Sequence, residues 1–223
     1  MSELTLKNLM FRYKNTNQDV LSNVNFTFES GKLYAIVGPS GSGKSTLLSL
    51  MAGLLSPTEG DVLLDNQSYK SLNLDQLRRE KLTVIFQAFH LFPLLTAIEN
   101  VSFPMEINGI SPAESMPKAA KLLEEVGISG EKHKRYPANL SGGEQQRVAI
   151  ARALSTGAGI LLADEPSGNL DEANSVQVME LLLELAHARN RCVIVVTHDL
   201  ELAARADQVL PMKDKTLSDD SIR

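Results

Sequence analysis

Two kinds of hydrophobic pattern run along the chain, and each predicts a different kind of strand. Apolar and polar positions alternate in LTLKNLMFRY (4–13), VNFTFES (24–30) and GDVLLDNQ (60–67), which predicts half-buried strands of an antiparallel layer. Four shorter runs are almost wholly apolar: LYAIVG (33–38), LTVIFQ (82–87), GILLAD (159–164) and CVIVVTH (192–198). Such runs, separated by helical stretches, are typical of parallel strands that are buried on both faces. The predicted fold class is therefore α/β.

A segment rich in proline and glycine separates the second and third of these apolar runs. Within residues 90–140, PAESMPKAAKLLEEVG (112–127) has the composition of a helix. Ser111 and Glu114 are spaced as a capping box, and Gly127 is placed as a C-cap. We expect a helical sub-lobe here, and we expect the polar tail 213–223 to fray.

Composition narrows the class of protein. The chain has 223 residues, of which 43% are hydrophobic and 22% charged, which suits one large domain or a domain with a sub-lobe. Its net charge of -5 provides no general basic field, so a nucleic-acid partner is disfavoured, although a local basic patch stays open. The single Cys192 lies in an apolar run and is expected to be buried. With no signal-peptide pattern and no long apolar run, we expect a cytoplasmic location.

The segment GPSGSGKST follows the first apolar run and precedes a helical stretch, which is the context of a phosphate-binding loop. It matches G-x-x-x-x-G-K-[ST], in which backbone N–H groups surround a polyphosphate. Lys44 would reach the terminal phosphates and Ser45 would ligate Mg²⁺. A flexible turn before a helix is the alternative, but a random chain of this length matches the motif only about once in a hundred trials. The candidate nucleotide-binding residues are Gly38, Pro39, Ser40, Gly41, Ser42, Gly43, Lys44, Ser45 and Thr46.

Polar side chains also end the other three apolar runs. Asp164 and Glu165 close the third run, where Asp164 would hold Mg²⁺ and Glu165 would activate a water molecule. Gln87 and His198 close the second and fourth runs. Taken singly, each residue could simply terminate a strand. Together with Gly38 they are predicted to line one edge of the sheet, where ligands of open α/β sheets bind.

LSGGEQQRVAIARAL (140–154) has the composition of a helix but places two glycines in its first turn. A helical glycine costs about 1 kcal/mol relative to alanine, so a reason is needed. Ser141 and Glu144 are spaced as a capping box, which explains the helix start but not the glycines. The pattern favours a site that needs bare backbone at this helix start.

Taken together, GPSGSGKS, Gln87, LSGGEQQ, LLADEP, SGNLD and His198 make the chain resemble the nucleotide-binding subunits of ATP-binding cassette (ABC) transporters over essentially its whole length. The resemblance implies a P-loop NTPase of the ABC type, with a mixed parallel sheet, an antiparallel β layer and a helical sub-lobe. It implies one domain, 1–223, in which 1–88 and 155–223 form a RecA-like core and 89–154 a helical subdomain. ATP and Mg²⁺ are the implied ligands.

The same resemblance implies a role for each motif residue. Lys44, Gln87, Glu165 and His198 are the implied catalytic residues, and Ser45, Gln87 and Asp164 the implied Mg²⁺ ligands. Tyr13 falls at the adenine-stacking position, although it could equally supply a core ring. The implied contacts to ATP across a subunit interface are Ser141, Gly142, Gly143, Glu144 and Asp171.

Partners are also implied. The family works as a head-to-tail pair, a homodimer or a pair with a similar subunit, beneath separately encoded permease subunits on the inner face of the membrane. Apolar residues after Gln87 (Phe89, Leu91, Phe92 and Leu94) are candidates for permease docking or for sub-lobe packing. DEPSGNLD and the LSGGEQQ segment resemble the subgroup that serves lipoprotein release, macrolide and antimicrobial-peptide export, and cell division. A force-transmitting ATPase that transports nothing is the open alternative.

Overall fold

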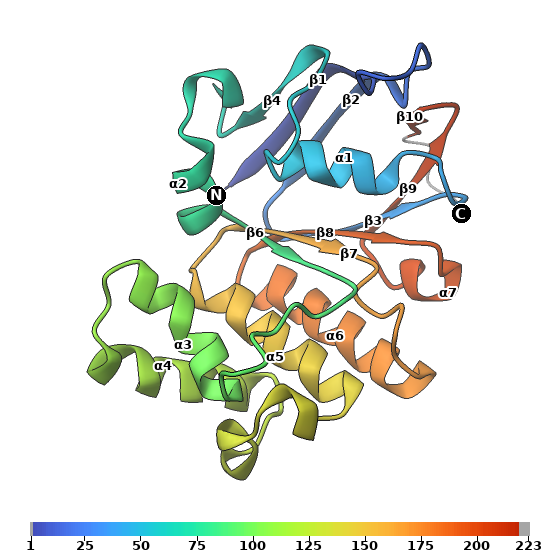
Figure 1. The fold of residues 1–223 in the computed structure, drawn as a ribbon. Helices are drawn as coiled ribbons and strands as arrows, with labels where there is room; N and C mark the ends of the chain where they lie inside the picture. Colours follow the sequence, from blue (N-terminus) through green and yellow to red (C-terminus); the bar gives the residue numbers. More distant parts are fainter. Residues whose placement is uncertain (1, 219–223) are drawn as a thin grey trace.

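The computed structural model describes residues 2–218, and their strands form two sheets (Figure 1). The antiparallel sheet has the order β2-β1-β4-β5, and the second sheet the order β10-β9-β3-β8-β7-β6. In the second sheet all neighbours are parallel except β9 and β10. The strands are β1 Glu3–Phe11, β2 Leu21–Glu29, β3 Leu33–Val37, β4 Glu59–Leu64, β5 Gln67–Ser68, β6 Leu82–Ile85, β7 Ile160–Asp164, β8 Cys192–Thr197, β9 Gln208–Lys213 and β10 Thr216–Leu217.

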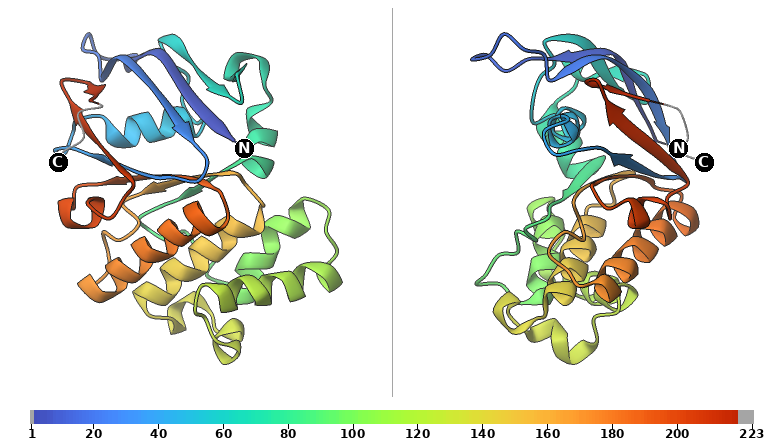
Figure 2. Two further views of the ribbon diagram at one scale, coloured as in Figure 1. Left: turned by 180° about the vertical axis from the view of Figure 1, so that it is seen from behind. Right: turned by 90° about the vertical axis from the view of Figure 1, so that its right-hand side faces the viewer.

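Helices fill the space between the two sheets and cover the far face of the second one. Figures 1 and 2 show α1 between the sheets and α3 to α6 together on the opposite side of the second sheet. The α-helices are α1 Lys44–Met51, α2 Leu74–Glu80, α3 Ala97–Ile107, α4 Pro112–Glu125, α5 Gly142–Ser155, α6 Glu172–Ala188 and α7 Leu200–Ala203, and the 3₁₀ helices are η1 Tyr69–Ser71, η2 Gly130–Lys134 and η3 Pro137–Asn139.

Two hydrophobic cores lie on the two faces of the second sheet. In β8 every residue is buried, and successive side chains alternate between the cores: Ile194 joins α1 and the antiparallel sheet, whereas Val193 and Val195 join the helical side. Cys192 is buried as expected, and this burial raises the pKa of its thiol to about 12. The helical core includes residues of α3, α4, α5, α6 and the sheet, so the sub-lobe shares its core with the sheet.

The structure confirms the four apolar runs as parallel strands and the three alternating runs as antiparallel strands. Two local predictions need correction. Ser111 occupies the N-cap position of α4, but its side chain makes no capping bond, and the Glu114 N–H donates to the Ser111 carbonyl oxygen at 2.9 Å. Residues 213–217 of the tail belong to β9, a turn and β10, Ser218 follows β10, and the remainder lies outside the described residues. Gly127 follows α4 with φ +74°, as a C-terminal cap requires. No helix within residues 2–218 has the length and apolar character to cross a membrane.

Candidate nucleotide-binding site

The predicted phosphate-binding loop connects β3 to α1 at the carboxyl end of the sheet. Gly41 and Gly43 have φ values of +78° and +104°, a region that favours glycine, and Gly43 is the N-cap of α1. The Lys44 side chain folds back over the loop, where its Nζ donates to the carbonyl oxygens of Gly38 at 2.8 Å and Pro39 at 3.0 Å. The loop thus surrounds an ammonium group at the start of a helix.

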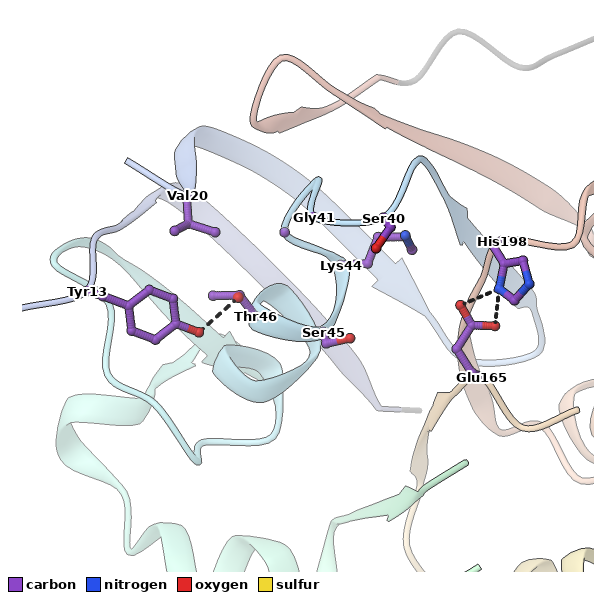
Figure 3. A pocket seen from close by; sticks show the side chains of 10 residues that line it. Tyr13, Val20, Ser40, Gly41, Lys44, Ser45, Thr46, Glu165 and His198 are labelled. Atoms are coloured by element: carbon purple, nitrogen blue, oxygen red, sulfur yellow. Dashed lines mark hydrogen bonds and ion pairs between the residues drawn. The ribbon is translucent and has the colours of Figure 1, made fainter. Parts of the chain in front are cut away.

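A pocket of about 430 Å³ lies beside this loop (Figure 3). Tyr13 stands at one end and the Glu165–His198 pair at the other, with the loop between them. The Tyr13 ring is 45% exposed, so it is not a core residue, and its hydroxyl lies 3.1 Å from Thr46 Oγ1. The pocket is lined by Tyr13, Val20, Ser40, Gly41, Gly43, Lys44, Ser45, Thr46, Glu165 and His198.

Ser45 and Asp164 meet at the base of α1. The Ser45 hydroxyl donates to Asp164 Oδ1 at 3.2 Å, which joins the phosphate-binding loop to the end of β7. Burial raises the pKa of Asp164, and the charge of Glu165 adds to that shift. Because ionisation of Asp164 costs free energy in this environment, a bound cation would stabilise the ionised carboxylate.

Glu165 holds an unusual backbone conformation next to His198. Its φ is +47°, which is uncommon for a residue with a side chain, and its N–H donates to Val196 O of the neighbouring strand at 2.9 Å. The two carboxylate oxygens lie 2.9 and 3.0 Å from His198 Nδ1. The Glu165 side chain is 17% exposed and that of His198 is 71% exposed. An anchored carboxylate therefore holds an imidazole that faces the pocket and solvent.

Gln87 lies at the same sheet edge but outside the pocket. The strand β6 ends at Ile85, so Gln87 stands in the loop that follows, where its backbone O accepts from Asn169 Nδ2 at 3.1 Å. Arg152 of α5 donates to the next carbonyls of this loop, Phe89 O at 2.9 Å and His90 O at 2.6 Å. The segment after Gln87 is thus held by α5 and by the loop after β7.

The start of α5 explains one of the two adjacent glycines. The predicted capping box is present: Ser141 Oγ accepts from Glu144 N at 3.3 Å, and Glu144 Oε2 accepts from Ser141 N at 2.8 Å. A Cβ on Gly143 would stand 2.2 Å from Asn174 Oδ1 of α6, whereas a Cβ on Gly142 would meet nothing closer than 3.5 Å. Gly143 is required by packing, and Gly142 is not.

Asp171 caps the helix that packs against this glycine. Its Oδ1 accepts from the backbone N–H of Asn174 at 2.9 Å, and both of its oxygens accept from the Asn174 side chain. Asn174 in turn accepts from Arg147 Nη1 of α5 at 3.3 Å. Neither Asp171 nor residues 141–144 line the pocket that holds Lys44. The described residues therefore carry two separate groups of predicted ligands.

Comparison with known proteins identifies the family. The model of the ABC transporter family matches residues 21–168. The chain is 41% identical over 207 residues to the uncharacterized ABC transporter ATP-binding protein YclH of Bacillus subtilis (strain 168), covering 93% of this chain and 92% of that protein. The chain belongs to the ABC transporter family. It is an ATP-binding cassette, an α/β P-loop NTPase, and an ATPase of this family.

Solved structures of a second cassette agree along the whole chain. A dimeric structure of MJ0796, a bacterial ABC transporter cassette, is 38% identical and superposes with a TM-score of 0.88 over 99% of each chain. A dimeric post-hydrolysis state of MJ0796 bound to ADP and Pi matches with the same identity, coverage and TM-score.

The cassette also carries an apolar groove near the loop that follows Gln87. This groove, about 390 Å³, runs between α3 and α5 and is bordered by Arg78, Arg79 and Arg152. Phe92 lines it, is 43% exposed and stacks edge-on against Phe103. Of the four apolar residues predicted here, Leu94 is 86% exposed and Leu91 packs on the core, whereas Phe89 is only partly exposed.

Sequence reasoning missed the polar residues that hold the motifs in place. Asn169, Asn174, Arg147 and Arg152 link the loop after β6, the helix α5 and the start of α6. Each of these residues lies inside or beside a quoted motif, but the sequence pattern does not indicate which elements the residue joins. The packing of α5 against α6 brings Arg147 to Asn174, and the loop after β6 meets both Asn169 and Arg152.

Proposed function

We propose that this ATPase is the motor subunit of a transport complex, in which two cassettes bind ATP head to tail and drive separately encoded permease subunits. One observation carries the proposal: Lys44 and Ser45 face the Glu165–His198 pair across one pocket, while the LSGGE helix start lies outside it. A site that needs both groups is completed by a second copy.

Binding of ATP is assigned to the pocket. Tyr13 stacks on the adenine, residues 38–46 surround the phosphates with their N–H groups, and Lys44 pairs with the terminal phosphates. Because an aromatic ring stacks on the face of any purine, this contact does not distinguish the edge groups of adenine from those of guanine.

Hydrolysis is assigned to the pair at the other end of the pocket. Glu165 accepts a proton from the water that attacks the γ-phosphate, and His198, held at 2.9 Å by this carboxylate, contacts the γ-phosphate. Gln87, whose loop is fixed by Asn169, senses both the metal and the permease.

The oxygen donors fit Mg²⁺. Ser45 Oγ, on a residue that lines the pocket, lies 3.2 Å from Asp164 Oδ1. Hard oxygen donors from one carboxylate plus substrate phosphates are the usual magnesium environment. When bound, the ion supplies positive charge that offsets the negative charge of the transferring phosphoryl group. Gln87 is assigned as its third protein ligand.

The partner's contribution comes from the second group of residues. Gly142 and Gly143 present their N–H groups, and Ser141 its hydroxyl, to the γ-phosphate held by the other subunit, with Glu144 in the same turn. Asp171, at the start of α6, crosses the interface beside them.

The permease is assigned to the groove between α3 and α5. Its exposed Phe92, its apolar lining and its three bordering arginines suit a cytoplasmic helix that carries apolar and acidic side chains. This places the cassette on the inner face of the membrane. DEPSGNLD and LSGGEQQ support membership of the lipoprotein-release, peptide-export and cell-division subgroup.

The composite site is tested with two variants and size-exclusion chromatography in ATP. Glu165→Gln removes the general base and relieves carboxylate repulsion near the γ-phosphate, so it is expected to accumulate as an ATP-bound dimer. Adding Ser141→Arg is expected to abolish the dimer but not ATP binding by the monomer. A monomeric Glu165→Gln protein, or a double variant that dimerises equally well, contradicts the head-to-tail site. Co-purification of the membrane partner then distinguishes transport from force transmission.

A further inference from the structure

The LSGGE helix carries a negative charge at the place where an anion is expected to approach. Glu144 lies in the first turn of α5, and its Oε2 accepts from the N–H of Ser141 at 2.8 Å. Its side chain is only 14% exposed. A carboxylate here stabilises the helix start, but like charges repel, so the same carboxylate opposes a phosphate at that helix end.

Lys132 stands against the other oxygen of this carboxylate. Its Nζ lies 2.6 Å from Glu144 Oε1, and 34% of the Lys132 side chain is exposed. This hydrogen bond is the main reason that the pKa of Glu144 is lowered, and the charge of Arg147 adds a smaller effect. Arg147 itself donates to Asn174 and Gln177, so Lys132 is the cation in direct contact with Glu144.

The turn that presents Lys132 is anchored in the sub-lobe. Lys132 belongs to η2, and its N–H donates to Ser129 O at 2.8 Å. The next residue, His133, is buried, and its Nε2 lies 2.9 Å from Ile128 O. The anchored turn keeps the backbone of Lys132 within reach of Glu144, so that only the side chain of Lys132 has to be ordered to form the ion pair.

We propose that Lys132 is a positioning residue for the ATPase reaction, because it holds and neutralises Glu144 so that the α5 start can accept the partner's γ-phosphate. The inference rests on the proposed head-to-tail site. This role of Lys132 explains how the LSGGE motif can contain the carboxylate of Glu144 and still approach the negatively charged phosphates of ATP. It also predicts that glutamine at position 144, which keeps the capping geometry without the charge, makes Lys132 dispensable.

The experiment measures ATP-dependent dimerisation by sedimentation in the Glu165→Gln background. Lys132→Met is expected to raise the dimer dissociation constant by about tenfold, because each of the two sites gains an unpaired carboxylate. Monomer ATP affinity and thermal unfolding are expected to stay at the parent values. Arg189→Met, which removes the ion pair between Arg189 at the end of α6 and Glu125 at the end of α4, is the matched control and is expected to dimerise normally.

A rescue experiment shows whether Lys132 acts by neutralising Glu144 or only by supporting the structure of the sub-lobe. Lys132→Met combined with Glu144→Gln is expected to restore parent dimerisation, and Lys132→Arg, which keeps the charge, to need no rescue. Parent-like dimerisation of Lys132→Met, or a combined variant as weak as Lys132→Met, overturns the inference. If the Glu165→Gln parent itself stays monomeric in ATP, the head-to-tail site is wrong and the inference falls with it. Because Lys132→Arg and Glu144→Gln are mild changes, they test the charge argument even if Lys132→Met does not fold.

Discussion

Tyr13 is the residue on which we propose that base recognition depends in this cassette. The ring lines the pocket, and its hydroxyl contacts Thr46 at the start of α1. We expect Tyr13→Ala to weaken ATP and GTP binding by a similar factor, because stacking uses the purine face. Tyr13→Phe keeps the ring but loses the hydroxyl, so it is expected to bind both nucleotides nearly as well as the parent. Titration calorimetry with both nucleotides checks this, and a large ATP preference that survives Tyr13→Ala would place the base elsewhere.

The carboxylate of Asp164 is expected to lower the stability of the nucleotide-free protein and to be needed for magnesium-dependent hydrolysis. Burial raises its pKa, so folding disfavours the ionised form. This cost is present at pH values above the folded pKa and disappears as pH falls below the unfolded value of about 3.9. Asp164→Asn is therefore expected to raise the melting temperature of the nucleotide-free protein at pH 7.5, with a gain that shrinks toward pH 4. The same change is expected to abolish magnesium-dependent hydrolysis.

Thermal scans across this pH range test the Asp164 prediction. Asp61→Asn on β4, outside the pocket, is the matched control, and its melting temperature is expected to lack the same pH-dependent gain. A loss of stability in Asp164→Asn at pH 7.5 would show that the bond from Ser45 outweighs the cost of burial.

At the scale of elements, the start of α5 gives two adjacent glycines opposite tolerances. Gly143→Ala forces a methyl group against Asn174, whose side chain is fixed by Asp171, so we expect a loss of about 1–3 kcal/mol in unfolding free energy. At Gly142 there is room for a methyl group, and alanine is a better helix former than glycine. We therefore expect Gly142→Ala to cause no loss of monomer stability. Urea unfolding measures both. Asn174→Ala should restore much of the stability of Gly143→Ala, and no restoration would mean that the clash is not the cause.

The strands that sequence could predict are those whose burial follows a regular pattern, either alternating or uniform along the strand. β3, β7 and β8 read as apolar runs because core lies on both of their faces. β9 escaped prediction because QVLPMK mixes polar residues and a proline, although it pairs with β3 in the sheet. The turn into β10 uses Asp214 and Lys215, both at positive φ, in place of the usual glycine, so its signal is weak.

The features of the site also divide into those that the sequence could predict and those that depend on tertiary packing. The sequence predicts Gly38, Gln87, Asp164, Glu165 and His198 at one sheet edge, because parallel strands end there. Of these, Glu165 and His198 line the pocket together with Lys44 and Ser45, whereas Gln87 lies outside it. The ion pair of Lys132 with Glu144 could not be anticipated, because their turn and helix meet only through sub-lobe packing. The roles assigned to these ligands stay predictions.

At the scale of the whole molecule, one chain carries two separate groups of predicted ATP ligands. Lys44 lies in the pocket, whereas Ser141 begins a helix that does not line it. In a head-to-tail pair, each ATP would use Lys44 of one chain and Ser141 of the other. Mutations at these positions should therefore complement one another between chains, which no arrangement with a complete site in each chain allows.

A mixing experiment tests this complementation directly. Lys44→Ala and Ser141→Arg chains are each expected to be inactive, but a mixed dimer regains one intact site, because the good loop of one chain meets the good helix start of the other. Random pairing then gives up to about a quarter of parent ATPase activity, since half the dimers are mixed and each has one working site. Mixing either variant with the chain that carries both changes leaves every site defective, so this control should stay inactive. If the two single variants also stay inactive together on their membrane subunits, where assembly is enforced, Lys44 and Ser141 do not act on the same nucleotide.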